Sequence, residues 1–192
     1  MRDADDDALM RLAGAGDRAA FSRLVQRHLM RASRLALRMA GNRADAEEIV
    51  QEAFLRAWLK APEWLARDFV GDAAGATFFT WLARVIVNFC LDRRRRKPPS
   101  PIEAASEVVD PAPSAYDAVA SRETAARVAA AVAALPDRQR AALVMCHYEE
   151  MSNADAATAL GLSVGAVESL LVRARRTLRE SLAELASGSM AK

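Results

Sequence analysis

Apolar side chains recur at helical spacing along most of the chain, and this pattern predicts helices rather than strands. The first run extends from Phe21 to Met39 and stops at Gly41-Asn42-Arg43, residues typical of a helix C-terminus. A second stripe begins near Ala44, and Pro62 is expected to end that helix. A third run predicts a helix from about Phe78 to Arg95.

Two segments interrupt this pattern. The stretch 66–77 contains Gly71 and Gly75 and is predicted to be a loop. Residues 98–114 hold five of the seven prolines together with serine and acidic residues, a composition that does not bury a core. We therefore expect a flexible linker, assigned to 98–121, with helices resuming near Tyr116.

The C-terminal pattern predicts a helix-turn-helix. Leu135-Pro136-Asp137 ends one helix and starts another, which continues through 141–150. Ser152 is a suitable N-cap for a short alanine-rich helix, Gly161 supplies the turn, and Ser163 caps a last helix to about Leu178. Its expected inward face comprises Val164, Val167, Leu171, Ala174 and Leu178.

Composition supports an all-α fold, because 52% of the residues are hydrophobic but only 6% are aromatic. We predict two small helical domains, 1–97 and 122–192, joined by the flexible proline-rich and acidic linker 98–121, the C-terminal domain containing the helix-turn-helix. The net charge of +2 divides into +5 for residues 1–97, −4 for 98–121 and +1 for 122–192. This asymmetry is a weak indication of nucleic-acid binding.

Several classes of function are disfavoured. No stretch of about 20 apolar residues exists, so no membrane insertion is expected, and the acidic N-terminus is unlike a secretory signal. A cytoplasmic location is therefore expected. Cys90 and Cys146 are far apart and are interpreted as reduced thiols in helices, with no metal site and no cofactor. The sequence contains no cluster of catalytic side chains, so an enzyme is not expected.

The outer face of the last helix is basic, which alone is more typical of an ordinary solvated helix than of a DNA-binding one. Combined with a short small-residue helix, a glycine turn and a serine cap, it favours insertion in the DNA major groove. The candidate contacts to the DNA are Glu168, Ser169, Val172, Arg173 and Arg176.

Four motifs, in order and at matching spacing, resemble the extracytoplasmic-function sigma factors of the sigma-70 family. The segment 44–58, ADAEEIVQEAFLRAW, resembles their polymerase-binding helix, and 78–93, FFTWLARVIVNFCLDR, is similar to their promoter-melting helix. LPDRQR at 135–140 and LSVGAVESLLVRARRTLR at 162–179 look like their C-terminal domain. The resemblance covers about residues 15–97 and 122–183.

The resemblance implies roles for the N-terminal domain. An acidic face would bind the polymerase clamp, and the helix at 78–95 would bind the −10 promoter element, with Asn88 on a base edge and Phe69 near the captured base. Trp81 is expected to pack in the core, while Phe78 is left open between the two roles. The implied polymerase contacts are Asp45, Glu48, Gln51 and Glu52, and the implied phosphate contacts are Arg93, Arg94 and Arg95.

The implied role of the helix-turn-helix is to read the −35 element, and two features depart from the family pattern. Glu168 and Leu170 stand where the family often carries a basic residue and an arginine, so an atypical −35 sequence is expected. The loop 71–77 is also longer than expected.

The implied partners are core RNA polymerase, promoter DNA and an anti-sigma factor, in a stress or envelope response. Two other classes remain as alternatives. One is a regulator that binds an operator by itself, and the other is a helical adaptor that binds only proteins. The absence of a long coiled-coil pattern argues against the first, and the arginines of the last helix argue against the second.

Overall fold

The computed structural model describes residues 5–65, 77–96 and 117–188, and in these ranges all the regular elements are helical. The expected all-α class is confirmed. The elements are α1 (Asp6–Gly14), α2 (Arg18–Ala40), α3 (Arg43–Leu65), α4 (Phe78–Arg96), α5 (Asp117–Ala134), α6 (Asp137–Leu143), a π-helical turn (Val144–Tyr148), α7 (Asn153–Leu160) and α8 (Val164–Gly188).

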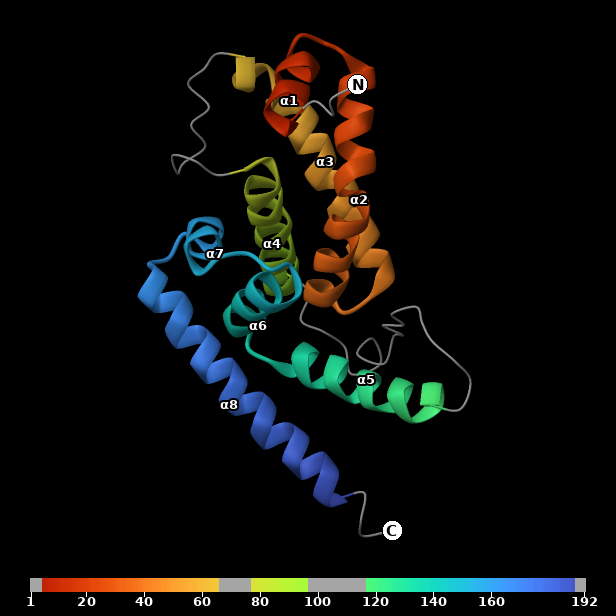
Figure 1. Cartoon of the computed structure of the whole chain (residues 1–192), viewed down its shortest axis with the longest axis vertical. Helices are drawn as coiled ribbons and strands as arrows, with labels where there is room; N and C mark the ends of the chain where they lie inside the picture. Colours follow the sequence, from red (N-terminus) through yellow and green to blue (C-terminus); the bar gives the residue numbers. More distant parts are fainter. Residues whose placement is uncertain (1–4, 66–76, 97–116, 189–192) are drawn as a thin grey trace.

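The N-terminal half is built on the long helices α2 and α3, with α1 packed on both of them and α4 along their other side (Figure 1). Gly41 ends α2 in the left-handed region, at a φ of 84°, and its N–H donates to Leu37 O. That turn lets α3 fold back against α2. The apolar stripes of the three long helices meet in the core through fully buried side chains that include Leu24, Leu35, Met39, Ile49, Ala53, Leu82 and Ile86.

The C-terminal half packs directly against the N-terminal half. Helix α7 lies beside α4 (Figure 1), and the π-helical turn and α5 contact α2. The buried apolar side chains of both halves consequently form one continuous cluster. Residues 97–116, which include most of the expected linker, lie outside the described residues, and α5 already begins at Asp117.

The buried guanidinium group of Arg140 on α6 is one of the contacts that join the two halves. Its side chain is only 1% exposed. It donates to Leu135 O at 2.9 Å and to Ala133 O at the end of α5, and to Met39 O at 3.0 Å at the end of α2. Carbonyl groups at helix C-termini carry partial negative charge, so the cation stabilises both helix ends. Burial lowers the pKa of Arg140 to about 10, which still leaves it protonated at neutral pH.

Four expectations about the elements were wrong or incomplete. Pro62 does not end its helix, since α3 continues to Leu65, and a proline in the last turn removes only one hydrogen bond. Helix α1 was not predicted, although Asp5 caps it by accepting a hydrogen bond from Ala8 N at 2.6 Å. The helix expected through 141–150 changes to a π-helical turn at Val144. Helix α8 runs ten residues beyond Leu178, to Gly188.

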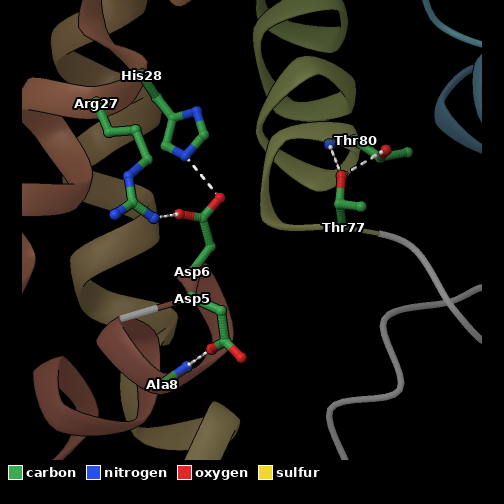
Figure 2. Close-up of polar contacts among 7 residues, drawn as sticks. All are labelled: Asp5, Asp6, Ala8, Arg27, His28, Thr77 and Thr80. Atoms are coloured by element: carbon green, nitrogen blue, oxygen red, sulfur yellow. Dashed lines mark hydrogen bonds and ion pairs between the residues drawn. The ribbon is translucent and has the colours of Figure 1, made fainter. Parts of the chain in front are cut away.

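Helix α1 is fastened to α2 by a small polar cluster. Figure 2 shows Asp6 between Arg27, whose Nη1 lies 2.6 Å from Oδ1, and His28, whose Nε2 lies 2.7 Å from Oδ2. The same view shows Thr77 at the start of α4, where its hydroxyl accepts from Thr80 N at 3.2 Å. Burial lowers the pKa of His28, although the neighbouring Asp6 opposes this shift.

Replacement of Arg140 by methionine should destabilise the protein by about 3 kcal/mol, because buried carbonyl groups lose their donor. Arg138→Met is the matched control, since Arg138 is exposed on the same helix and should change stability by less than about 0.5 kcal/mol. Urea unfolding followed by circular dichroism measures both values. Equal losses in the two variants would show that the buried network is not stabilising.

The lowered pKa of His28 also predicts a pH dependence of stability. The folded protein binds a proton on His28 less readily than the unfolded chain does, so its contribution is complete above pH 6.5 and declines on acidification through the folded-state pKa. Between about pH 7.5 and about pH 5, His28→Gln should therefore lose less unfolding free energy than the parent protein. His147→Gln, which changes an exposed histidine, is the control for the loss of a histidine as such. Identical pH profiles for the parent and His28→Gln would contradict this assignment.

Candidate nucleic-acid and polymerase interfaces

Helices α7 and α8 form the expected helix-turn-helix, with an angle of 100° between them. The hydroxyl of Ser152 caps α7 by accepting from Asp155 N at 3.0 Å, and that of Ser163 caps α8 by accepting from Ala166 N at 3.2 Å. Gly161 makes the turn in the left-handed conformation, at a φ of 63°. Local capping and one glycine therefore set the angle at which α8 leaves the domain.

The outer face of α8 is open to solvent. All five candidate −35 residues are exposed, and they are Glu168, Ser169, Val172, Arg173 and Arg176. Val172 is 64% exposed, unusually open for a large apolar side chain. The hydroxyl of Ser169 donates back to Gly165 O at 2.9 Å, so it is already engaged in the free protein.

The inward face of α8 is mostly as expected. Val167, Leu171 and Ala174 are buried, and Leu178 is half-buried against the core. Val164 was expected inward but is 42% exposed. The N-terminal turn of the recognition helix thus presents apolar surface next to its polar face.

Helix α4 places Asn88 on the surface while its apolar neighbours face the core. Leu82 and Ile86 are fully buried, and Asn88 is exposed. Phe78, left open by the sequence, is fully buried, and Trp81 is half-buried against the core as expected. Phe69 and residues 71–76 of the loop lie outside the described residues, whereas Thr77 precedes α4.

The three arginines expected to contact phosphates have different environments. Arg93 bridges α4 to α3, with Nη2 2.7 Å from Asp45 Oδ1 and 2.6 Å from Glu48 Oε2. Its hydrogen bond to Glu48 raises the pKa of Arg93. Arg94 forms an ion pair with Asp137 of α6. Arg95 is exposed, 3.7 Å from Asp92 on its own helix. The arginines expected to contact phosphates and the acidic face expected to bind polymerase therefore adjoin each other.

The acidic face of α3 is only partly free. Asp45 is half-buried and belongs to the start of the helix, where its N–H donates to Asn42 Oδ1 at 2.8 Å. Glu48, Gln51 and Glu52 are exposed. Leu55 and Leu59 on the next two turns were not among the expected polymerase contacts, and they are 57% and 67% exposed. At 100° per residue they share the face of Glu48, and this position outside the buried stripe was the signal that could have revealed them.

Comparison with known proteins decides the family. Residues 24–98 match the family model for Sigma-70 region 2, and residues 125–178 match that for Sigma-70, region 4. The chain is 38% identical over 183 residues to the "ECF RNA polymerase sigma factor SigM" of Mycobacterium tuberculosis, covering 95% of this chain and 87% of the relative. The chain is an extracytoplasmic-function sigma factor. As such it is a transcription initiation factor that acts with RNA polymerase at promoter DNA, and it is not an enzyme.

Other relatives agree with this membership. The SigW sigma factor of Bacillus subtilis is 31% identical over 181 residues, with 88% of this chain and 92% of the relative covered. The solved structure of CnrH in complex with the cytosolic domain of CnrY superposes with a TM-score of 0.68 at 30% identity, over 93% of this chain and 97% of that one. The sigma factor RpoE of Bartonella quintana, solved with the anti-sigma factor NepR, shares the fold at a TM-score of 0.62 and 24% identity.

The two family matches follow the two halves of this sigma factor. Region 2 extends from Leu24 in α2 through α4, and region 4 extends from α5 to Leu178 in α8. Helix α1 precedes the first match, and it is fastened to the domain by its own contacts with Arg27 and His28.

This sigma factor contains two cysteines, and neither forms a disulfide. Cys90 is free and buried, and burial raises its pKa to about 12. Cys146 is free and half-buried, 3.5 Å from Asn153 Oδ1, and burial raises its pKa as well. In the part of the chain that the structure describes, no three histidine, cysteine or acidic side chains are grouped as metal ligands. In the same part, no single helix is long and apolar enough to cross a membrane, although α7 and α8 would together reach that length.

Proposed function

We propose that this sigma factor divides promoter recognition among three solvent-exposed faces. The face of α3 binds core RNA polymerase, α4 binds the −10 element, and α8 reads the −35 element. The observation that carries the proposal is the exposure of Glu48, Gln51 and Glu52, of Asn88, and of the outer face of α8 on helices whose opposite sides are buried. Residues 1–97 and 122–192 would act as the two functional domains, with 98–121 as the linker.

The polymerase-binding face of α3 combines charge with apolar surface. Gln51 and Glu52 are exposed and offer acceptors for basic side chains of a partner, while Leu55 and Leu59 add apolar area beside them. Charge complementarity at such a face accelerates association and fixes register, and apolar contacts slow dissociation. Glu48 shares its carboxylate with Arg93, so binding there requires the partner to compete with an internal ion pair.

The −10 contact of α4 is centred on Asn88. Strand capture requires a polar group at the edge of an unstacked base, and an exposed amide both donates and accepts hydrogen bonds. Phe78 contributes to this site only through the core, because it is fully buried. Arg95 is exposed at the end of the same helix and is placed for phosphate contact, whereas Arg93 and Arg94 must first leave their acidic partners.

The −35 contact of α8 differs from an ordinary basic recognition helix. Glu168 can accept from cytosine N4, and the exposed Val172 suits a thymine methyl group. Arg173 and Arg176 lie on later turns of the same face and supply phosphate contacts. This combination supports an atypical −35 sequence.

We further propose an anti-sigma factor as the regulator, acting in a stress or envelope response. Support comes from the sigma factor RpoE of Bartonella quintana, which was solved in complex with the anti-sigma factor NepR, and from CnrH, which was solved in complex with the cytosolic domain of CnrY. A cytoplasmic location follows from the proposed ligands, because core RNA polymerase and promoter DNA are found there in bacteria.

Co-migration with core RNA polymerase tests the proposal, and Glu52→Lys sharpens the test. The parent protein should co-migrate with core. Together with core it should initiate at a specific promoter, and without core it should not initiate. Charge reversal at Glu52 should weaken core binding about tenfold or more, because it repels a basic partner at the centre of the face. Glu47→Lys is the control, since Glu47 is exposed on another side of α3 and should bind nearly as the parent does. Tight operator binding without polymerase would instead favour a self-sufficient regulator.

Replacement of Asn88 by alanine should impair promoter opening without weakening core binding. The lost base-edge hydrogen bonds predict about 1–3 kcal/mol less discrimination, or roughly tenfold to a hundredfold slower opening. Permanganate footprinting of the melted region measures opening, and co-migration measures core binding. If both fall together, Asn88 has a structural role.

A further inference from the structure

Helix α2 carries a line of arginines that the proposed function leaves without a role. Its 23 residues include six arginines and no acidic residue. At 100° per residue, five of the six lie within an arc of about 80° and extend for about 22 Å along the helix. We call these five the arginine face, and they are Arg23, Arg27, Arg31, Arg34 and Arg38.

This arrangement is unfavourable for an isolated helix. Like charges three or four residues apart destabilise a helix by about 0.2–0.5 kcal/mol per pair, and the arginine face contains four consecutive pairs of this kind. A solvated helix normally intersperses acids to avoid this repulsion. Here the neutralising groups come from other elements, namely Asp6 of α1 on Arg27 and Glu149, beyond the π-helical turn, on Arg31.

The C-terminal end of this face is already in contact with two residues of the chain itself, Tyr148 and Glu149. Arg31 Nε lies 2.9 Å from Glu149 Oε2, and its Nη2 donates to the main-chain carbonyl of Glu149. The guanidinium of Arg38 lies 4.3 Å from the ring centroid of Tyr148. The C-terminal end of the arginine face thus holds an anionic group and an adjacent ring.

Glu149, which lies against the C-terminal end of the arginine face, is held there at the cost of its hydration. The side chain of Glu149 is 3% exposed, and burial raises its pKa even though Arg31, Arg38 and Arg34 oppose the shift. An ionised carboxylate that is desolvated in this way is a weaker ligand than a solvated polyanion that can engage several arginines at once. Arg23 and Arg34 are exposed on the same line, Arg23 at its N-terminal end and Arg34 between Arg31 and Arg38.

We propose that the arginine face of α2 binds the phosphate backbone of DNA, and that Tyr148 and Glu149 occupy its C-terminal end when the two halves are packed together. A regular line of guanidinium forks suits a chain with one anion per unit, and release of counterions favours a polyphosphate over a peptide with scattered acids. The inference rests on the proposed function only in taking DNA as the polyanion.

The test measures binding of fluorescein-labelled DNA of arbitrary sequence to the full chain over a range of salt concentrations. One arm uses a single-stranded oligonucleotide and the other its duplex. Arg23→Gln/Arg34→Gln removes two exposed charges from the face. It should weaken binding severalfold and reduce the slope of log K against log salt by about 1.4 for single strands, or about 1.8 for duplex. The form of DNA whose affinity falls by the larger factor between the parent protein and the double variant is the form that the arginine face binds.

Arg18→Gln is the matched control, because Arg18 is exposed on the opposite side of the same helix. It should leave the salt slope unchanged. Glu149→Gln, which removes the competing charge, should tighten binding. Equal slopes for the double variant and the control would overturn the proposal, as would displacement of the DNA by poly-glutamate at matched charge. Core co-migration of the parent protein is scored separately, so loss of that association refutes the proposed function without altering the slope comparison.

Discussion

The guanidinium group of Arg140 is the contact on which the arrangement of the two halves depends. A buried cation is tolerated only where acceptors replace its hydration, and here the acceptors are carbonyl groups at the ends of α5 and α2. These groups belong to different halves of the chain. Pairing both terminal nitrogens of this side chain with those carbonyl groups therefore fixes α6 against the end of α2, although its buried Nε has no hydrogen-bond partner. Helix α6 is followed directly by the π-helical turn and by α7 and α8.

Once α6 is fixed, the surface charges pair across the molecule. Arg94 meets Asp137, and Arg31 meets Glu149, while Arg93 links α4 to the acidic start of α3. Each of these arginines satisfies an acid inside the protein before any ligand arrives. The proposed binding of polymerase or DNA at these places is thus an exchange of partners, and its net free energy is smaller than the contacts alone would suggest. On the outer face of α8 the contacts stay within the helix, where Arg176 lies 3.8 Å from Glu180 and Ser169 donates to Gly165 O.

The bounds of α4, the helix-turn-helix and the exposure of Asn88 could be predicted because they depend on local periodicity and on capping by serine and glycine. Other features depend on tertiary contacts. The π-helical turn at Val144 and the extension of α3 past Pro62 have no local signal strong enough to override ordinary helix rules. The pairing of Arg93 with Asp45 and Glu48 joins residues more than 40 positions apart. Sequence periodicity could assign both sets to surfaces, but it could not show that the surfaces meet.

The contact between α4 and α7 has a geometric consequence for promoter binding. Elements at −10 and −35 are separated by about 25 base pairs, which is roughly 85 Å of duplex at about 3.4 Å per base pair. Because α7 contacts both α4 and α8, the faces proposed for the two elements cannot lie so far apart in this packed form. Under the proposed division of contacts, the packed sigma factor engages one promoter element at a time, and simultaneous reading of both requires its two halves to separate.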